Sequence, residues 1–427
     1  MKKIKITFPD NSFIEAENEI RPILFLEKFN AQNKKIVAVK VNNEICSLDS
    51  PVNITSSIEP VFSDSKDGSA IYRRSLCFVL AAAAHKIFPG KRLLVGHSLG
   101  YGYYYTLELG EPLTKENILK LKNEMEQIVK DDKIIETDFI SYSEACSLFE
   151  ELGLTETRKQ LNYRCPSRVQ INRLEGFSDL YFGPLVGTTG ILNVFDLLPY
   201  SDGFLLRFPK KGQPEKLTEF VDQPKLFEIY KSYKLWGKRL NVTSAASLNQ
   251  LIHDRKESEF IDITETLQTK RISTIADEIL KKKSARIVLI AGPSSSGKTT
   301  TSKKLALQLE AIGYKPKVIS LDSYYLGRAQ TPKDENGNYD YECLEALNIE
   351  LLNQNLVDLF AGKQIKLPSY DFHAGVSYFK GDTMTLEESD ILIMEGIHGL
   401  NDKLTPLVPA DKKFKIYAII PKIVFYL

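Results

Sequence analysis

The sequence has little cysteine and little histidine for its length. Its 427 residues include five of each. The cysteines, Cys46, Cys77, Cys146, Cys165 and Cys343, are odd in number and scattered. This spacing excludes the close pairs that bind zinc or build a disulfide framework, so we expect the cysteines to be reduced and mostly buried.

The sequence also lacks a net charge and a long apolar run. Its 56 basic and 55 acidic residues leave a formal charge of +1, so no global field attracts it to nucleic acid or to an anionic membrane, although a local basic patch stays open. No apolar run approaches the ~18 residues that cross a bilayer. Residues 1–8 alternate polar and apolar positions, which predicts a strand and not a signal peptide. We expect a cytoplasmic protein with no membrane partner.

What the sequence does contain is a complete phosphate-binding loop. Residues 291–300 read Ala-Gly-Pro-Ser-Ser-Ser-Gly-Lys-Thr-Thr, between an apolar run and a helix-like segment, a context that argues against a mere Gly/Ser-rich turn. Gly292 and Gly297 allow a tight turn whose backbone N–H groups point at phosphate oxygens. Lys298 can reach the β- and γ-phosphates, and the Thr299 hydroxyl can ligate Mg²⁺. The predicted ATP-binding residues are Gly292, Pro293, Ser294, Ser295, Ser296, Gly297, Lys298, Thr299 and Thr300.

Two carboxylates follow the loop at the ends of predicted strands. Asp322 comes directly after the apolar run 317–321, at the edge where open α/β sheets bind ligands. There it can accept the proton of an attacking hydroxyl, and a helix cap or an ion pair is the alternative role. Glu395 closes the strand that begins at Asp390, where it can hold Mg²⁺ through water or be only a surface charge.

The order of these segments resembles the uridine kinase family, which is related to phosphoribulokinase. The shared signatures are the P-loop, Asp-Ser-Tyr-Tyr (322–325), Asn-Tyr-Asp (338–340), Pro-Ser-Tyr-Asp-Phe (368–372) and Glu-Gly-Ile (395–397). The resemblance covers residues 284–417. It implies ATP-dependent phosphorylation of a nucleoside 5′-hydroxyl with Mg²⁺.

The resemblance also implies roles for individual residues. These are catalysis by Asp322 and Lys298, nucleoside binding by Tyr325, Asp340 and Tyr370, and Mg²⁺ binding by Thr299 and Glu395. Where the family usually carries a histidine after Tyr-Asp-Phe, this chain has Gly375, and His373 comes earlier. A nucleoside other than uridine or cytidine therefore stays open, as do base recognition by His373 and the role of Asp371.

The end of the chain departs from that family. The family continues past its fourth strand, expected here at 414–417, with a helix, an Arg-rich lid (Arg-Arg-Ile-x-Arg-Asp) and another strand. The lid guanidiniums stabilise charge on the transferring phosphoryl group. This chain has the apolar segment 418–427 instead. We expect a truncated or frame-shifted product with weak or no turnover.

The N-terminal half resembles threonyl-tRNA synthetase in two segments. Residues 1–62 alternate at Ile4 and Ile6, carry a short helix-like segment at 23–29 and reach a turn after the strand 36–41, which predicts hairpins with one helix. They resemble the β-grasp TGS domain of these synthetases and of some GTPases. Residues 63–215, with a helix over 74–87, a glycine-rich strand and Asp-Leu-Tyr-Phe-Gly-Pro, resemble the synthetase editing domain.

The editing resemblance fails at the chemical positions. The family places a His-x-x-x-His pair and a Cys-x-x-x-His there, and the matching residues of this chain are Arg74, Phe78, Tyr181 and Leu185. None of these offers a metal ligand or a base, so we expect no deacylase chemistry. His85 and His97 lie nearby without that spacing, and we expect structural roles for both.

The predicted fold class is therefore multidomain, combining α+β and α/β parts. The expected domains are a β-grasp domain (1–62), an α+β editing-like domain (63–215), a helical connector (216–283) and an incomplete parallel P-loop kinase domain (284–427). In the connector, Ile272, Ile275, Ile279 and Leu280 predict a core-facing helical stripe.

Three functional hypotheses stay open. The leading one is an ATP-dependent nucleoside kinase. The second is a nucleotide-sensing RNA- or ribosome-associated protein, which binds RNA through its N-terminal domains. The third is a GTPase, against which the chain shows no Asn-Lys-x-Asp motif for reading guanine.

Overall fold

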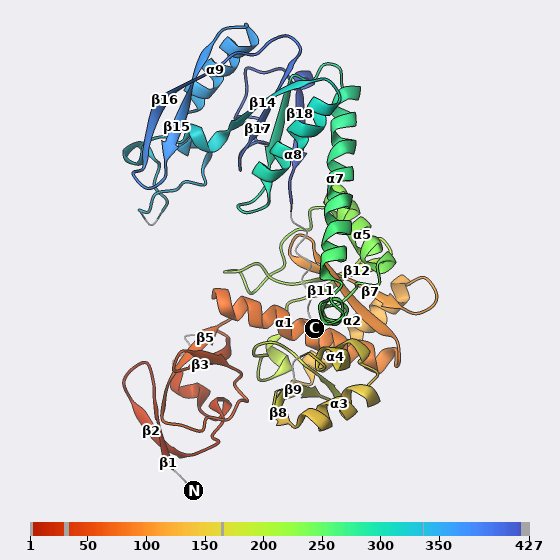
Figure 1. Cartoon of the computed structure of the whole chain (residues 1–427). Coiled ribbons are helices and arrows are strands. Elements are labelled where there is room, and N and C mark those ends of the chain that lie inside the picture. The colour runs from red at the N-terminus through yellow and green to blue at the C-terminus, as the bar shows by residue number, and fades with distance from the viewer. Residues whose placement is uncertain (1–2, 30–33, 164–165, 336, 420–427) are drawn as a thin grey trace. The chain divides into compact units, whose positions relative to one another are not determined.

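The computed structural model describes residues 3–29, 34–163, 166–335 and 337–419 (Figure 1). Within these ranges the chain forms two compact units, the first ending at Arg255 and the second beginning at Lys256. Cys165 and residues 420–427 of the predicted apolar tail lie outside the described residues. Cys77 and Cys146 are buried, whereas Cys46 and Cys343 are only partly buried.

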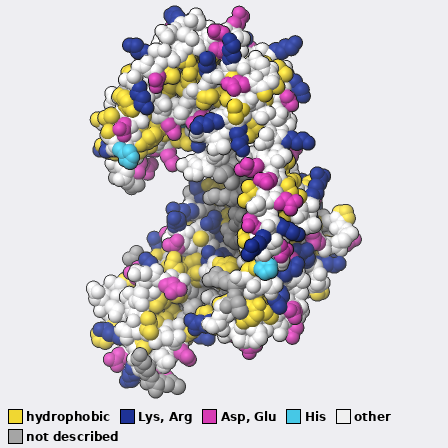
Figure 2. Space-filling view, in the orientation of Figure 1, with side chains coloured by type: hydrophobic (Ala, Val, Ile, Leu, Met, Phe, Trp, Pro, Cys, Tyr) yellow, Lys and Arg dark blue, Asp and Glu magenta, His cyan; other side chains and the backbone are white. Residues whose placement is uncertain are grey.

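The surface shows the mixed charge that the composition predicts. Figure 2 shows acidic and basic side chains interspersed over one face, in keeping with 56 basic and 55 acidic residues. In the described part of the chain, no helix combines the length and the apolar character that a membrane span requires.

The first unit begins with a mixed five-stranded sheet of order β2-β1-β5-β3-β4. β1 and β5 run parallel, and the other pairs are antiparallel. The predicted short helix is a 3₁₀ helix, η1 (Pro22–Phe29), whose Phe25 and Phe29 rings each lie 5.7 Å from the Phe8 ring. The predicted pattern of hairpins with one helix is confirmed, and the TGS assignment stays a prediction. The strands are β1 (Lys3–Thr7), β2 (Phe13–Glu17), β3 (Ile36–Val41), β4 (Glu44–Cys46) and β5 (Ser56–Phe62).

Two helices supply most of the main core of the first unit. α1 (Lys66–Ile87) begins before the predicted Arg74, because Ser65 caps its first turn by accepting from the Gly68 N–H. α2 (Lys115–Lys130) is capped by Thr114 as predicted. Their buried residues form one core with residues from strands β7 (Gly102–Glu108) and β12 (Gly203–Arg207).

These strands belong to an antiparallel sheet of order β11-β12-β7-β6. Side chains alternate along β7, so Tyr103 and Tyr105 join the core of α1 and α2, while Tyr104 joins a separate cluster with Phe227. The two faces of this sheet therefore pack against different helices. The strands are β6 (Arg92–Ser98), β7 (Gly102–Glu108), β11 (Asp196–Tyr200) and β12 (Gly203–Arg207), and η2 (Thr189–Ile191) precedes β11 in the chain.

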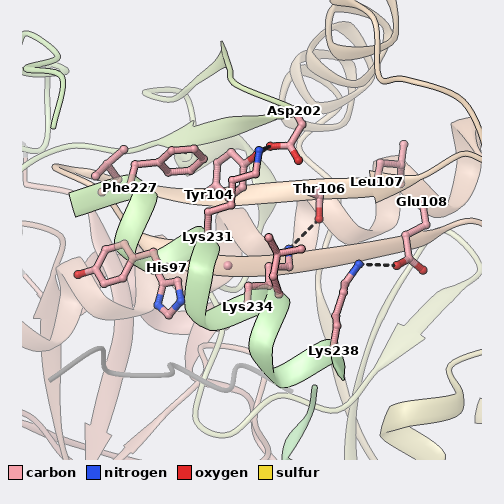
Figure 3. A pocket seen from close by; sticks show the side chains of 14 residues that line it. His97, Tyr104, Thr106, Leu107, Glu108, Asp202, Phe227, Lys231, Lys234 and Lys238 are labelled. Carbon is pink, nitrogen blue, oxygen red and sulfur yellow. Dashed lines mark hydrogen bonds and ion pairs between the residues drawn. The ribbon is translucent and has the colours of Figure 1, made fainter. Parts of the chain in front are cut away.

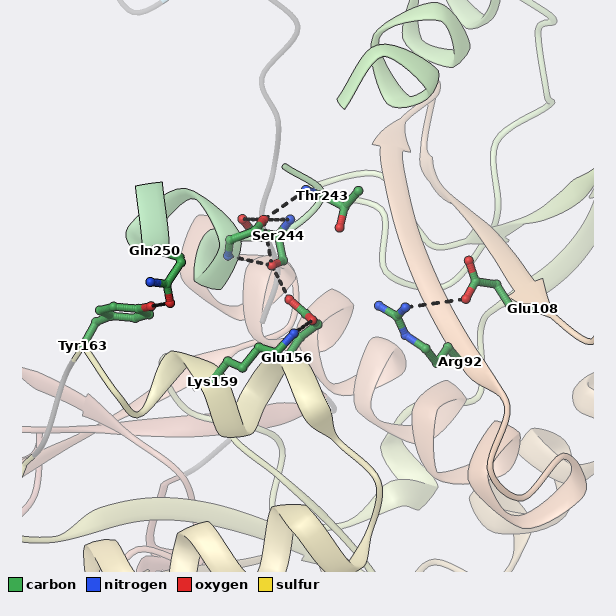
Figure 4. A network of polar contacts seen from close by, with 9 residues as sticks. Arg92, Glu108, Glu156, Lys159, Tyr163, Thr243, Ser244 and Gln250 are labelled. Atoms are coloured by element: carbon green, nitrogen blue, oxygen red, sulfur yellow. Dashed lines mark hydrogen bonds and ion pairs between the residues drawn. The ribbon is translucent and has the colours of Figure 1, made fainter. Parts of the chain in front are cut away.

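A third sheet, β10-β9-β8, packs with two short helices, and two more helices follow. Figure 4 shows how α6 attaches to α4: Ser244, the N-cap of α6, donates its hydroxyl to Glu156, and Tyr163 donates to Gln250. The bounds are β8 (Glu136–Ile140), α3 (Tyr142–Glu151), α4 (Thr155–Gln160), β9 (Val169–Leu174), β10 (Phe177–Asp179), α5 (Pro224–Arg239) and α6 (Ala245–His253).

The junction between the units lies inside the segment predicted as a connector. α5 and α6 belong to the first unit, and α7 (Glu257–Lys281) belongs to the second. Residues 252–259 are exposed, and Arg255 has a left-handed φ of 56°. On α7, Ile272 and Ile279 are buried as predicted, but Leu280 is 44% exposed and Ala276 takes its place in the core.

The second unit is built on a fully parallel sheet of order β14-β17-β13-β18. β13 and β17 are buried along their whole length, and the burial of β17 includes the carboxylates Asp390 and Glu395 at its two ends. α7 and α8 share one core with this sheet. The elements are β13 (Ile287–Ala291), α8 (Lys298–Ala311), β14 (Lys315–Ser320), α9 (Ile349–Phe360), β15 (Ile365–Asp371), β16 (Val376–Met384), β17 (Asp390–Glu395) and β18 (Lys413–Tyr417).

Short 3₁₀ turns complete the second unit: η3 (Leu321–Tyr324), η4 (Arg328–Gln330), η5 (Leu344–Ala346) and η6 (Ala410–Lys412). β15 and β16 form an antiparallel hairpin apart from the parallel sheet. The chain is thus a mixed α/β protein of several sheets with a parallel sheet in its C-terminal region, which is the predicted class at this level.

Candidate functional site

The phosphate-binding loop has the backbone that its sequence predicts. It joins the end of β13 to the start of α8, and Gly297 caps α8 with a left-handed φ of 81°. A Cβ at Gly292 would lie 2.1 Å from the Ala418 carbonyl oxygen, so only glycine fits there. The Ser296 hydroxyl is buried and, among the described residues, has no hydrogen-bond partner. A phosphate oxygen in the loop is a partner of the right chemistry for it.

Lys298 lies against the same loop. Its Nζ donates to the carbonyl oxygen of Pro293 at 2.9 Å. The ammonium is therefore held at the mouth of the loop, where a phosphate group competes with a single carbonyl for it.

Thr299 and Glu395, the two residues predicted to hold Mg²⁺, meet directly. The Thr299 hydroxyl donates to Glu395 Oε1 at 3.1 Å, and the Ser320 hydroxyl donates to the same oxygen at 2.9 Å. Glu395 is 4% exposed. Mg²⁺ prefers oxygen ligands and usually keeps several waters and phosphate oxygens, so a hydroxyl and a carboxylate fit it. Sequence reasoning did not assign Ser320, whose only signal is its place at the end of β14.

Asp322 lies in the first turn of η3, directly after β14. Burial raises the pKa of its carboxyl, the Glu395 charge raises it further, and the Lys298 ammonium lowers it. Among the described residues no hydrogen bond or ion pair engages this carboxylate. The two alternative roles, a helix cap and an ion pair, therefore receive no support.

The predicted nucleoside residues Tyr325 and Tyr370 are brought together in an aromatic cluster. Their ring centroids lie 5.5 Å apart, and the Phe372 ring lies 6.0 Å from Tyr325 and 5.0 Å from Tyr370. Burial raises the pKa of Tyr325 to about 12, and its hydroxyl donates to the Tyr341 carbonyl. Phe372 is 61% exposed. Its exposed ring at the cluster was not assigned from sequence.

Two aspartates of the same region shape turns. Asp340 Oδ1 accepts from the backbone N–H groups of Glu342 at 2.9 Å and Cys343 at 3.2 Å. Asp371 Oδ1 accepts from those of His373 and Ala374, and these bonds hold the pKa of its carboxyl below the usual value. Asp371 thus shapes the turn between β15 and β16 through one of its two carboxylate oxygens. His373 is exposed.

The four residues that the sequence resemblance places at the editing positions, Arg74, Phe78, Tyr181 and Leu185, converge in the first unit and form a packed core. Arg74 Nη1 donates to the Pro184 carbonyl at 2.8 Å. The Phe78 and Tyr181 rings are 5.3 Å apart at a steep angle, and Phe78 and Leu185 are fully buried. Burial raises the pKa of Tyr181 well above its ordinary value. In the described ranges no group of three or more His, Cys, Asp or Glu side chains is placed to hold a metal ion.

The two nearby histidines are engaged in ring contacts. The His85 ring lies 5.4 Å from Phe177, and the His97 ring stacks on Tyr230 at 4.1 Å. Each histidine is thus packed against an aromatic ring, as expected for a structural role.

Comparison with known proteins separates the two halves of the chain. Residues 287–422 match the family model described as "Phosphoribulokinase / Uridine kinase family". A solved structure titled as a possible uridine kinase from Bacillus stearothermophilus shares 28% identity over 35% of this chain and 79% of that chain, with a TM-score of 0.29.

The curated relatives of the N-terminal part are threonine–tRNA ligases. That of Oleidesulfovibrio alaskensis is 27% identical over 222 residues, 51% of this chain and 34% of that protein. That of Lawsonia intracellularis is 30% identical over 174 residues, 40% of this chain and 27% of that protein. The chain spans about a third of the length of the curated relatives it matches. Both predicted resemblances are confirmed at this level.

Proposed function

We propose that the second unit transfers the γ-phosphoryl group of ATP to the 5′-hydroxyl of a nucleoside, giving a nucleoside monophosphate and ADP. The observation that supports this most is that three groups lie at the same end of the parallel sheet: a loop that can bind phosphate, a carboxylate that can hold Mg²⁺ and a carboxylate that can accept a proton. The phosphate-binding loop follows β13, Glu395 ends β17 against Thr299, and Asp322 follows β14. The family match over residues 287–422 points the same way.

In this proposal the loop binds and orients the triphosphate. Backbone N–H groups at the start of α8 and the Lys298 ammonium bind the β- and γ-phosphates. Thr299 and Glu395 would hold Mg²⁺, which when bound neutralises charge on the phosphate oxygens. Ser320 keeps the Glu395 carboxylate turned toward Thr299 through its hydrogen bond.

Asp322 takes the proton in the transfer step. The 5′-oxygen attacks the γ-phosphorus, the new O–P bond forms as the bond to the β-phosphate oxygen breaks, and the hydroxyl proton passes to the Asp322 carboxylate. Its raised pKa makes it a stronger proton acceptor than an exposed aspartate.

The aromatic cluster of Tyr325, Tyr370 and Phe372 offers ring faces for a nucleobase. Asp340 uses one carboxylate oxygen in its turn, which leaves the other for the ribose hydroxyls. Within the described residues no hydrogen bond orients the exposed His373 side chain, and the assay therefore compares four nucleosides.

The test is a kinase assay of the 427-residue chain with Mg-ATP and uridine, cytidine, adenosine or guanosine. Asp322→Asn measures the background from contaminating kinases, and Asp277→Asn, an exposed change on α7, is the matched control. We expect one nucleoside to be phosphorylated at a weak but measurable rate above the Asp322→Asn background. Inactivity on all four nucleosides, with ATP bound, contradicts the proposal.

A second function, RNA binding by the first unit, is supported by the similarity of the N-terminal part to threonine–tRNA ligases. In this function the P-loop senses nucleotide without turnover. Fluorescence anisotropy of a labelled tRNA mixture titrated with the full chain, with and without ATP, tests it. No saturable binding at moderate salt contradicts it.

A further inference from the structure

A pocket of about 220 Å³ lies between α5 and strands β6 and β7 of the first unit (Figure 3). Tyr104 and Thr106 of β7 face it. The packed editing positions share their core with Tyr103 and Tyr105, which point to the other face of the sheet. The pocket is therefore separate from those positions, and it lies in a different unit from the P-loop.

One wall of the pocket carries three lysines of α5 at helical spacing, Lys231, Lys234 and Lys238. Lys231 Nζ lies 3.3 Å from Asp202 Oδ1, and Lys238 Nζ lies 3.6 Å from Glu108 Oε1. Figure 3 shows Lys234 between these two pairs, where it donates to the Thr106 hydroxyl at 2.9 Å. Within the described ranges Lys234 makes no ion pair, so the pocket holds one positive charge more than it neutralises.

Of the three pocket lysines, Lys234 is the least exposed to solvent: Lys231 and Lys238 are exposed, and Lys234 is partly buried. Burial lowers the pKa of its ammonium, and the neighbouring Lys238 charge lowers it further. A hydroxyl compensates only part of the cost of burying an ammonium. An anion in the pocket would supply the missing counter-charge.

The remaining walls determine the size and polarity of the rest of the ligand. Tyr104, Phe227 and Tyr230 line the pocket with aromatic surface. Its volume falls below the ~300 Å³ at which sites for drug-sized ligands begin, so the ligand is small. A single unneutralised ammonium matches a singly charged carboxylate better than a phosphate dianion.

We propose that this pocket binds a small organic carboxylate. The carboxylate pairs with Lys234, and the apolar body of the ligand lies against Tyr104 and Phe227.

Benzoate is a suitable probe, because it is a small aromatic monoanion. Trp236, the single tryptophan of the chain, lies on α5 beside the pocket lysines, so its fluorescence reports on this helix. We expect benzoate to change this fluorescence saturably and benzyl alcohol, its neutral analogue, to bind far more weakly. Lys234→Met should weaken benzoate binding about 10- to 100-fold, the usual effect of losing a hydrogen bond to a charged group.

The matched control is Lys225→Met, an exposed lysine on the same helix outside the pocket. Its benzoate affinity should equal that of the wild type. Thermal unfolding of both variants checks the fold, and Lys234→Gln repeats the test if the methionine variant is unstable. Absence of benzoate binding, or equal binding by the wild type and both Lys234 variants, overturns the proposal. Tighter Lys234-dependent binding of inorganic phosphate than of benzoate overturns the carboxylate assignment.

Discussion

The packed core around Arg74, Phe78, Tyr181 and Leu185 differs from the phosphate-binding site in whether its polar groups have partners. At the first, Phe78, Tyr181 and Leu185 fill the space with buried apolar contacts, and Arg74 is bonded to a backbone carbonyl. At the second, Asp322 carries a raised pKa and makes no bond within the described residues, and the Ser296 hydroxyl has no partner there. The packed core therefore contributes to stability. At the phosphate-binding site, polar groups without a protein partner are available to bind a ligand.

The largest effect is expected on kcat, from the variant Asp322→Asn. Loss of a general base lowers kcat by about 10²–10⁴. The affinity for ATP should be retained, because the loop that binds phosphate is unchanged. Initial rates and ATP titration on the same preparation measure the two effects, with Asp277→Asn as control. An unchanged kcat for Asp322→Asn would remove the acid–base role.

Phe78→Ala should act on stability alone. Removing a fully buried phenylalanine costs about 3–5 kcal/mol of unfolding free energy. Trp236 lies in the first unit, so urea unfolding followed by its fluorescence measures this loss. Leu119→Ala, on an exposed α2 position, should change the free energy by less than about 0.5 kcal/mol. Reduced ATP binding by Phe78→Ala would show that the two regions are coupled.

Lys298→Ala should weaken ATP binding about 10- to 100-fold, because a charge-assisted hydrogen bond to phosphate is lost. Lys303→Ala, an exposed change on α8, is the matched control. A fluorescent ATP analogue measures both affinities. Equal affinity of Lys298→Ala and wild type would remove Lys298 from the site.

Asp179, beside the editing positions, should make the first unit less stable as pH rises. Burial raises the pKa of its carboxyl to about 6, against about 4 when unfolded. The folded state therefore binds more protons between these pH values, and stability falls as pH rises through this window. Asp179→Asn should be more stable than wild type at pH 7.5 by up to about 3 kcal/mol, and equal to it near pH 4. Urea unfolding of both proteins at pH 7.5 and pH 4 measures this difference. If Asp179→Asn is less stable than the wild type at pH 7.5, the predicted effect of the buried carboxyl is wrong.

The last prediction is that the first unit does not hydrolyse seryl-tRNA. Because Arg74, Phe78, Tyr181 and Leu185 offer no metal ligand or base, seryl-tRNA should lose its serine no faster with the protein than in buffer. Release above the buffer rate that Phe78→Ala abolishes would reverse our interpretation of the packed core.

Local motifs were predicted well from the sequence, because their geometry depends on neighbours along the chain. The P-loop, the Thr114 cap and the alternation of Ile4 and Ile6 are of this kind. The Thr299–Glu395 contact was also within reach, since parallel strands end at one edge.

Features set by distant packing were not predicted. Ser320 reaches Glu395 only because β14 pairs with β17, and the sequence does not state that pairing. Leu280 is exposed because the sheet contacts α7 on the face that carries Ala276, which apolar spacing alone does not reveal. The pocket lysine Lys234 depends on how α5 lies across Thr106.

The exposed junction around Arg255 has a consequence for cooperativity. Each side of it has hydrophobic clusters of its own, so melting is not expected to be all-or-none, and a scanning calorimeter should record two heat-absorption peaks. Trypsin, which cuts after arginine and lysine, has two adjacent targets there, Arg255 and Lys256. A brief digestion should thus yield two folded fragments, and each can be crystallised and titrated without the other.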